Sequence, residues 1–149
     1  DTRKTLPNYR VLQKYAVTVG GAKNHRFNLS DMILIKDNHI AESGSVEKAI
    51  LLAKKTKKKL KIEVECDNLD QVSKAIKLSP DVIMLDNMTI SEIKEAISII
   101  NKKCKIEVSG GVSLETIQKY KGLEIDFISV GSITNSPKSV DIGLDILQK

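Results

Sequence analysis

Five short apolar runs, each ending in polar or glycine residues, recur along this chain and constrain its fold more than any other feature. The runs end near residues 36, 65, 86, 109 and 131, so the last three intervals are 21, 23 and 22 residues. Such an interval holds one strand, one helix and two short loops. Uninterrupted apolar runs are typical of parallel strands that are buried on both faces. The sequence therefore predicts a repeated strand–helix unit in an α/β fold.

The number of repeats limits the architecture. A complete eight-unit α/β barrel needs about 250 residues, whereas this chain has 149. Five strands are visible, and the polar segment from Asp1 to Thr5 would end a strand that lies further upstream. We expect an open or incomplete TIM-like α/β barrel with parallel strands, formed by residues 1–149 as one domain. Because the chain opens without methionine and inside a motif, we expect it to be a piece of a longer protein.

Periodic apolar residues and capping residues predict the helices between these strands. Residues 11–19 and 46–56 have helical spacing of apolar side chains. Asn68 and Thr89 are expected to cap two further helices, each with a Gln or Glu three residues later. Ser113 is expected to start another helix, and residues 140–147 to form a short helix or a last strand.

Composition excludes several classes of protein. With 41% hydrophobic and 29% charged residues, the chain is globular, and no apolar run is long enough to cross a membrane. The lysine-rich segment 54–61 accounts for much of the net charge of +5. With no Trp and only three Tyr and two Phe, it is interpreted as a solvated helix end, without a nucleic-acid partner. Cys66 and Cys104 lack metal spacing, so we expect reduced thiols in a cytoplasmic protein.

A basic group is the first candidate for function. Arginine binds carboxylates and phosphates in a bidentate way, and lysine adds a point charge. If the barrel closes, the basic residues all lie at its mouth and line a pocket for a small molecule with several negative charges. Each one alone is equally consistent with a surface charge. The group consists of Arg3, Lys4, His25, Arg26 and Lys36.

An acidic group is the second candidate. Glu65 and Asp86 end successive strands, where they could hold Mg²⁺, bind ribose hydroxyls or stabilise a cationic centre. Helix caps or ion pairs to lysines are the structural alternative. Glu63 and Glu107 lie inside their strands, pointing either outward or into a polar barrel interior, and receive no role.

Glycine-bearing strand ends are the third candidate. Ser109, Gly110 and Gly111 end one strand, and Gly131 and Ser132 end the next. Glycines let backbone N–H groups approach an anion, and phosphate sites in barrels use the last two strand-end loops. The alternative is an ordinary tight turn at either position. The three groups together indicate an α/β barrel enzyme with a phosphate-bearing ligand.

Several motifs resemble one known family, over essentially the whole chain. The similar segments are Thr2–Thr5 (TRKT), Lys14–Val17, Gly20-Gly21, His25-Arg26, Leu34–Ile40 (LIKDNHI), Glu63–Glu65, Met84–Asn87 and Ser109–Gly111. They resemble nicotinate-nucleotide pyrophosphorylase (carboxylating), also called quinolinate phosphoribosyltransferase. The resemblance implies the C-terminal barrel domain of an enzyme of de novo NAD synthesis. That enzyme converts quinolinate and phosphoribosyl pyrophosphate to nicotinate mononucleotide, pyrophosphate and CO₂, with Mg²⁺.

The resemblance also implies roles for individual residues. Arg3, His25 and Arg26 would bind the quinolinate carboxylates. Lys4 and Lys36 would lie between the two substrates as catalytic groups. Glu65 and Asp86 would be catalytic at the ribose and would hold the metal, directly or through water. The 5′-phosphate would be bound by Ser109, Gly110, Gly111, Gly131 and Ser132.

The chain departs from the family pattern in identifiable places. The family has an N-terminal α/β domain that covers the barrel mouth of the neighbouring subunit and lends it an arginine, and this chain lacks that domain. The resemblance therefore implies at least a homodimer. Asn135 stands where the family usually has histidine, Ser132 where it has alanine, and Asn8 where it has glycine.

Two other interpretations stay open at this point. One is a different phosphate-binding barrel enzyme, such as an isomerase or lyase that uses Lys36 and does not depend on phosphoribosyl pyrophosphate. The other is a catalytically silent, truncated barrel domain that only binds phosphate ligands or dimerises.

Overall fold

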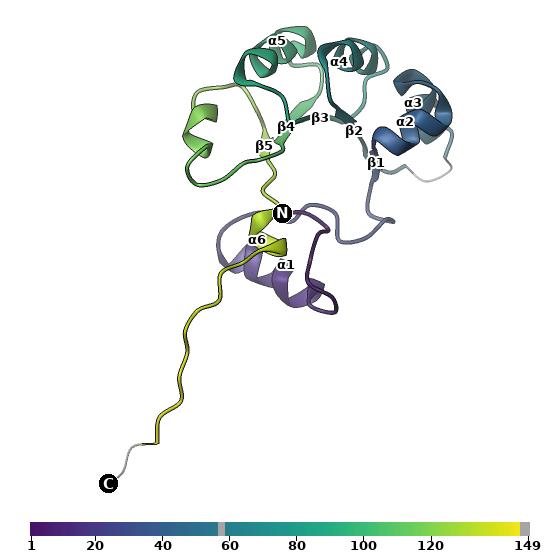
Figure 1. Cartoon of the computed structure of the whole chain (residues 1–149). Helices are drawn as coiled ribbons and strands as arrows, with labels where there is room; N and C mark the ends of the chain where they lie inside the picture. Colours follow the sequence, from purple (N-terminus) through teal and green to yellow (C-terminus); the bar gives the residue numbers. More distant parts are fainter. Residues whose placement is uncertain (57–58, 147–149) are drawn as a thin grey trace.

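A parallel sheet forms the centre of the computed structural model, which describes residues 1–56 and 59–146. Its five strands are β1 (Ile33–Ile35), β2 (Ile62–Cys66), β3 (Val82–Asp86), β4 (Lys105–Ser109) and β5 (Phe127–Ile128). They follow one another in sequence order, and each neighbouring pair is parallel. Within the described residues β1 and β5 do not pair, so the curved sheet stays open (Figure 1). The predicted open TIM-like barrel is thereby confirmed.

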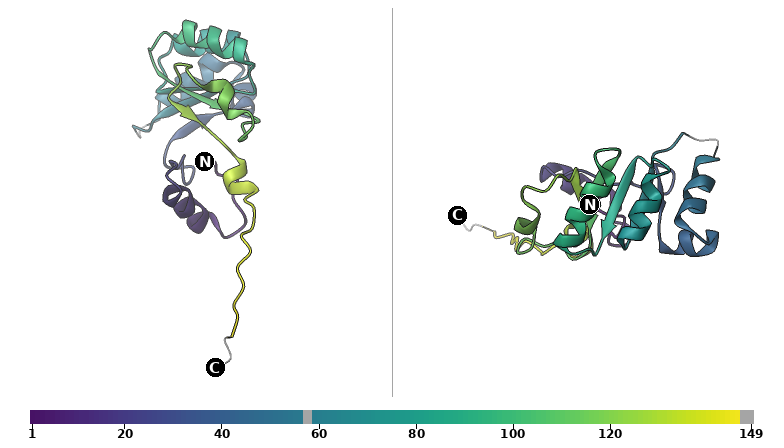
Figure 2. Two further views of the ribbon diagram at one scale, coloured as in Figure 1. Left: turned by 90° about the vertical axis from the view of Figure 1, so that its left-hand side faces the viewer. Right: turned by 90° about the horizontal axis from the view of Figure 1, so that it is seen from above.

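Helices lie on both sides of this sheet. They are α1 (Arg10–Val19), α2 (Asp37–Ser43), α3 (Val46–Lys54), α4 (Leu69–Ile76), α5 (Ile90–Ile100), the 3₁₀ helix η1 (Ile117–Tyr120) and α6 (Ser132–Asn135). Helices α3, α4 and α5 cover the convex side, whereas α1 and α6 lie on the concave side (Figure 1). Residues 136–146, after α6, extend away from the rest of the molecule (Figure 2).

Alternation along the strands separates an apolar face from a polar one. Ile62, Val64 and Cys66 of β2 are buried in the core between the sheet and the convex-side helices. Glu63 and Glu65, at the intervening positions, therefore lie on the concave face. The sheet of this chain is thus buried on both faces, with charged side chains inside the curve.

The predicted caps are confirmed where side chains define them. Ser45 Oγ, Asn68 Oδ1 and Thr89 Oγ1 each accept a hydrogen bond from the backbone N–H three residues later. Thr89 and Glu92 form the predicted capping box. These caps satisfy N–H groups that have no partner within the helix and fix where α3, α4 and α5 leave the sheet.

One prediction about helices was wrong, and another was confirmed. Residues from Ser113 form turns and the short η1 rather than a full helix. Helix α1 has the predicted position, but its apolar residues Val11, Leu12 and Tyr15 are 62–68% exposed. Lys14 and Val17 are the buried residues of α1, because that face packs towards the polar interior of the curve.

Three segments were predicted incompletely. Helices α2 and α6 were not foreseen, since α2 has few apolar residues and α6 is only four residues long. Residues 140–146 form neither a helix nor a strand, and Leu147 lies outside the described residues. Along this tail Val140, Ile142, Leu144 and Ile146 are 79–96% exposed.

The structure bears on two expectations from the sequence, one about membrane-spanning segments and one about the cysteines. No described helix combines the length and apolarity that crossing a membrane requires. Both cysteines are free thiols. Burial raises the pKa of Cys66 to about 12 and that of Cys104 to about 11, so both stay protonated at neutral pH.

Aspartates at strand starts connect neighbouring units of the sheet. Asp81, before β3, accepts a hydrogen bond from the Ile62 N–H of β2 at 2.8 Å. Asp126, before β5, does the same for the Ile106 N–H of β4 at 2.9 Å. Each carboxylate thus satisfies a backbone donor at the amino edge of the sheet, where the ladder begins.

Replacing Asp81 tests this contact. Asp81→Ala leaves the Ile62 N–H without its acceptor, so we expect the free energy of unfolding to fall by about 1–3 kcal/mol. Urea unfolding followed by circular dichroism measures the loss. Asp81→Asn keeps an acceptor oxygen and should lose less. Equal losses in the two variants would show that the hydrogen bond is not the stabilising element.

Candidate active site

The carboxyl ends of the strands meet at one edge of the curved sheet and bring predicted site residues together. Lys36 follows β1, Glu65 lies near the end of β2, and Asp86 and Ser109 end β3 and β4. The register places Asp86 directly beside Ser109. Because all strands run in the same direction, this edge gathers a cation, two acids and a glycine-bearing turn.

Lys36 and Glu65 form an ion pair across this edge. The Lys36 Nζ atom lies 2.6 Å from Glu65 Oε2, and the Glu65 side chain is only 11% exposed. The backbone N–H of Lys36 donates to His39 Nδ1 at 2.9 Å, which fixes the start of α2. The pair therefore joins the ends of β1 and β2 and holds the lysine over the concave side.

Three carboxylates converge next to this pair. Glu65, Asp67 and Asp86 each offer an oxygen, and these oxygens lie within 4.8 Å of one another. Asn87 Nδ2 donates to Asp86 Oδ2 at 2.7 Å and orients that carboxylate. Hard divalent cations such as Mg²⁺ take carboxylate oxygens as ligands, so this donor set fits the expected ion. Asp67 was not predicted as part of it.

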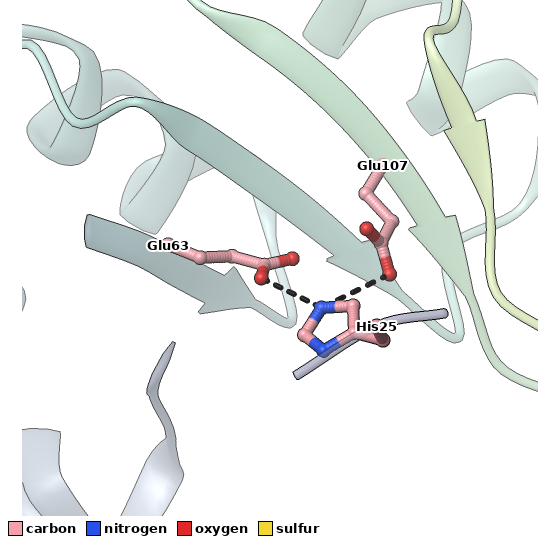
Figure 3. Close-up of side chains that lie close together, drawn as sticks. All are labelled: His25, Glu63 and Glu107. Atoms are coloured by element: carbon pink, nitrogen blue, oxygen red, sulfur yellow. Dashed lines mark hydrogen bonds and ion pairs between the residues drawn. The ribbon is translucent and has the colours of Figure 1, made fainter. Parts of the chain in front are cut away.

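A second charged cluster lies deeper in the curve. The His25 Nε2 atom lies 2.8 Å from Glu63 Oε2 and 3.8 Å from Glu107 Oε1 (Figure 3). Both glutamates are buried, at 1% and 4% exposure. Burial and the neighbouring Glu63 charge raise the pKa of Glu107, against the opposing effect of a hydrogen bond from Ser129. Glu63 and Glu107 thus face the polar barrel interior, which was one of the two orientations expected.

The arginines lie partly buried near these acids. Burial lowers the pKa of Arg26, and the Arg3 charge adds to this, while Glu63 and Glu65 oppose it. Arg3 Nε is buried and has no hydrogen-bond partner in the described part of the chain. Two arginines close enough to repel each other, one with an unused donor, form an arrangement that an anion would complete. Lys4 is exposed, with no ion pair among residues 1–56 and 59–146.

The two glycine-bearing turns differ in packing. Gly110 has φ +94°, and a Cβ there would lie 2.2 Å from Asn87 Oδ1 and 2.7 Å from the Asn87 backbone nitrogen. Gly111 has φ +60° and open space around it. At the next strand end, Gly131 precedes α6, where Thr2 Oγ1 contacts Thr134 Oγ1 at 3.4 Å. The N-terminal segment therefore lies against the second turn.

The structure gathers the predicted residues into adjacent sets and adds three that were missed. Glu63, Glu107 and Asp67 belong to the charged clusters but were given no role from sequence. A signal for the two glutamates exists, because the tetrapeptide Lys-Ile-Glu-Val occurs twice, at residues 61–64 and 105–108. Alternation within it places each glutamate on the face opposite the core.

The neighbouring glycines allow a matched test of the first turn. Gly110→Ala would place a methyl group against the Asn87 backbone and force an unfavourable positive φ, so we expect at least about 2 kcal/mol of destabilisation. Gly111→Ala meets only the backbone penalty, about 1 kcal/mol. Thermal and urea unfolding of both variants measures the difference. Identical stabilities would contradict the described approach of Asn87 to Gly110.

Comparisons with known proteins find relatives that match nearly the whole chain. A probable nicotinate-nucleotide pyrophosphorylase [carboxylating] of Methanocaldococcus jannaschii is 49% identical over 99% of this chain and 54% of the relative. The Mycobacterium leprae nicotinate-nucleotide pyrophosphorylase [carboxylating] is 44% identical over 98% of this chain and 52% of the relative. The solved nicotinate-nucleotide pyrophosphorylase of Ehrlichia chaffeensis superposes with a TM-score of 0.92 at 49% identity, covering 97% of this chain and 53% of that one.

The chain spans about half the length of the relatives it matches. A family model described as quinolinate phosphoribosyl transferase, C-terminal domain, matches residues 1–145. This match covers nearly every residue that forms the strands and charged clusters described above. The chain belongs to the family of quinolinate phosphoribosyl transferase C-terminal domains.

Proposed function

We propose that this chain is the catalytic barrel of a quinolinate phosphoribosyltransferase, which makes nicotinate mononucleotide from quinolinate and phosphoribosyl pyrophosphate in de novo NAD synthesis. Family membership supports the reaction. The observation that carries the proposal is the Lys36–Glu65 ion pair, with a carboxylate cluster on one side and the charge of the partly buried Arg26 close enough to interact with Glu65. One substrate is a dicarboxylate and the other carries phosphates and a ribose, so the site needs both kinds of charge.

Quinolinate is proposed to bind at the basic residues. Arg3, His25 and Arg26 would bind its two carboxylates, for which a guanidinium fork is suited. The unused buried Nε of Arg3 and the repulsion between Arg3 and Arg26 support this assignment. Bound carboxylates would supply the missing acceptor and neutralise both arginines.

Phosphoribosyl pyrophosphate is proposed to bind along the strand ends. Lys4 and Lys36 would lie between the two substrates, and Glu65 and Asp86 would face the ribose. Glu65, Asp86 and Asp67 are the groups that would hold Mg²⁺, directly or through water. The chemistry that a bound Mg²⁺ would supply is charge neutralisation on the departing pyrophosphate. The 5′-phosphate would lie against the turns at Ser109, Gly110, Gly111, Gly131 and Ser132.

The reaction needs positioning and electrostatic stabilisation more than covalent chemistry. Loss of pyrophosphate leaves a ribose with oxocarbenium character, which the Glu65 and Asp86 carboxylates would stabilise. The arginines would hold the pyridine nitrogen against the anomeric carbon, and such positioning supplies a large part of the rate. The pyridine nitrogen becomes cationic when it bonds to ribose. It can then accept the electrons released as CO₂ leaves the ring.

The surface of α1 supports an assembly larger than one chain. Val11, Leu12, Tyr15 and Val19 are 62–69% exposed on one short helix. Apolar patches of this kind mark interaction surfaces. We include in the proposal at least a homodimer and a cytoplasmic location.

Product formation tests the proposal. The chain is incubated with quinolinate, phosphoribosyl pyrophosphate and Mg²⁺, and nicotinate mononucleotide is separated by chromatography. Arg3→Ala and Glu65→Gln should each lower turnover by about 100-fold or more, since each removes a charge used in the transition state. Glu95→Gln, on the outer surface of α5, is the matched control and should leave turnover unchanged. Retained turnover in both site variants would contradict the assignment.

A further inference from the structure

Two buried glutamates contact the ring of His25 in the barrel interior. Glu63 comes from β2 and Glu107 from β4, and the His25 ring lies between them on the concave side (Figure 3). The shorter contact, 2.8 Å, is within hydrogen-bond distance of Nε2, whereas Glu107 at 3.8 Å makes an ion-pair contact only. Nε2–H therefore donates to Glu63.

Hydrogen bonds also fix the backbone of His25. Its backbone N–H donates to Asp1 Oδ1, and its carbonyl accepts from Lys14 Nζ at 3.0 Å. Lys14 and Asp1 form a buried ion pair with each other at 3.0 Å, both with side chains at most 3% exposed. Four charged groups from β2, β4, α1 and the first residue thus fix where the imidazole lies.

The polar atoms without a hydrogen-bond partner show how Glu63 and His25 interact. Glu63 Oε1 is buried and accepts no hydrogen bond among the described residues, so His25 is the side chain that this carboxylate binds. Burying a carboxylate with one unsatisfied oxygen is unfavourable, and apolar residues would stabilise the barrel interior better. With Nε2 used by Glu63, Nδ1 has no hydrogen-bond partner among residues 1–56 and 59–146 and points away from both carboxylates (Figure 3). The hydrogen bond at one nitrogen sets which function the other can perform.

We propose that Glu63 and Glu107 are positioning residues that hold the His25 ring through Nε2 and present its Nδ1 edge to a substrate carboxylate. This inference rests on the proposed function only for the identity of that substrate.

The test uses nitrogen NMR of the ¹⁵N-labelled chain together with calorimetry. The chain has two histidines, so His25→Gln identifies the signals of His25. In the wild type we expect His25 to show a protonated Nε2. In Glu63→Ala we expect the proton to exchange between the two nitrogens. Glu63→Gln keeps an acceptor and should restore the Nε2–H form without restoring the charge, whereas Glu107→Gln removes only the longer 3.8 Å contact and should keep the Nε2–H form.

Binding gives the second readout. We expect Glu63→Ala to weaken quinolinate binding about tenfold or more, and Glu63→Gln to weaken it less. Affinity for phosphoribosyl pyrophosphate should stay at the wild-type value, as it should for both ligands in the surface control Glu95→Gln. This split separates positioning from general destabilisation, which circular dichroism monitors in every variant.

The inference is overturned if the His25 nitrogen signals are the same in the wild type, Glu63→Ala and Glu107→Gln. It is also overturned if Glu63→Ala weakens both ligands equally. If the chain binds no quinolinate but the His25 signals change as described, the positioning role stands and the proposed substrate fails. The two proposals can therefore be judged separately, and Glu63→Gln keeps the test decisive should Glu63→Ala not fold.

Discussion

The burial of charge inside a curved parallel sheet is the constraint on which the rest of the structure depends. Apolar side chains of β2, β3 and β4 face the helices on the convex side, so the alternate positions point into the curve. Glu63 and Glu107 occupy such positions and cannot stay unpaired there. His25 approaches them, and the Lys14–Asp1 ion pair holds that segment in place. The N-terminal segment is thus folded into the barrel by charge pairing, since α1 buries little apolar surface.

The same curvature gathers the strand ends into one site. Lys36 and Glu65 pair across β1 and β2, and the carboxylate of Asp86 lies beside Ser109 on the next two strands. Under the proposed function, the acid-lined half of the edge would bind a metal-bound phosphoribosyl donor, and the arginine- and histidine-lined half would bind an organic dicarboxylate. The buried cluster below supplies the countercharge that lets several cations lie close together. The same interior residues therefore contribute both to the candidate site and to the folded structure of the curved sheet.

Sequence reasoning succeeded where a local pattern determines the structure. Apolar runs with polar ends located all five strands, and Asn68 and Thr89 located two helix starts, because strand burial and capping depend on neighbouring residues. It failed where the decisive partner is distant. The apolar spacing located α1 but did not show that Lys14 packs inward, where Asp1 lies. The role of Glu63 could not be inferred without knowing that His25, 38 residues away, faces it.

The most direct test of the central claim, that these strand ends form a substrate site in this chain, is calorimetric titration. The chain is titrated separately with phosphoribosyl pyrophosphate and with quinolinate, each with Mg²⁺. The account predicts that phosphoribosyl pyrophosphate binds at one site per chain, because the carboxylate cluster and both glycine-bearing turns belong to the barrel itself. Failure of both ligands to bind would contradict it and favour a catalytically silent barrel domain.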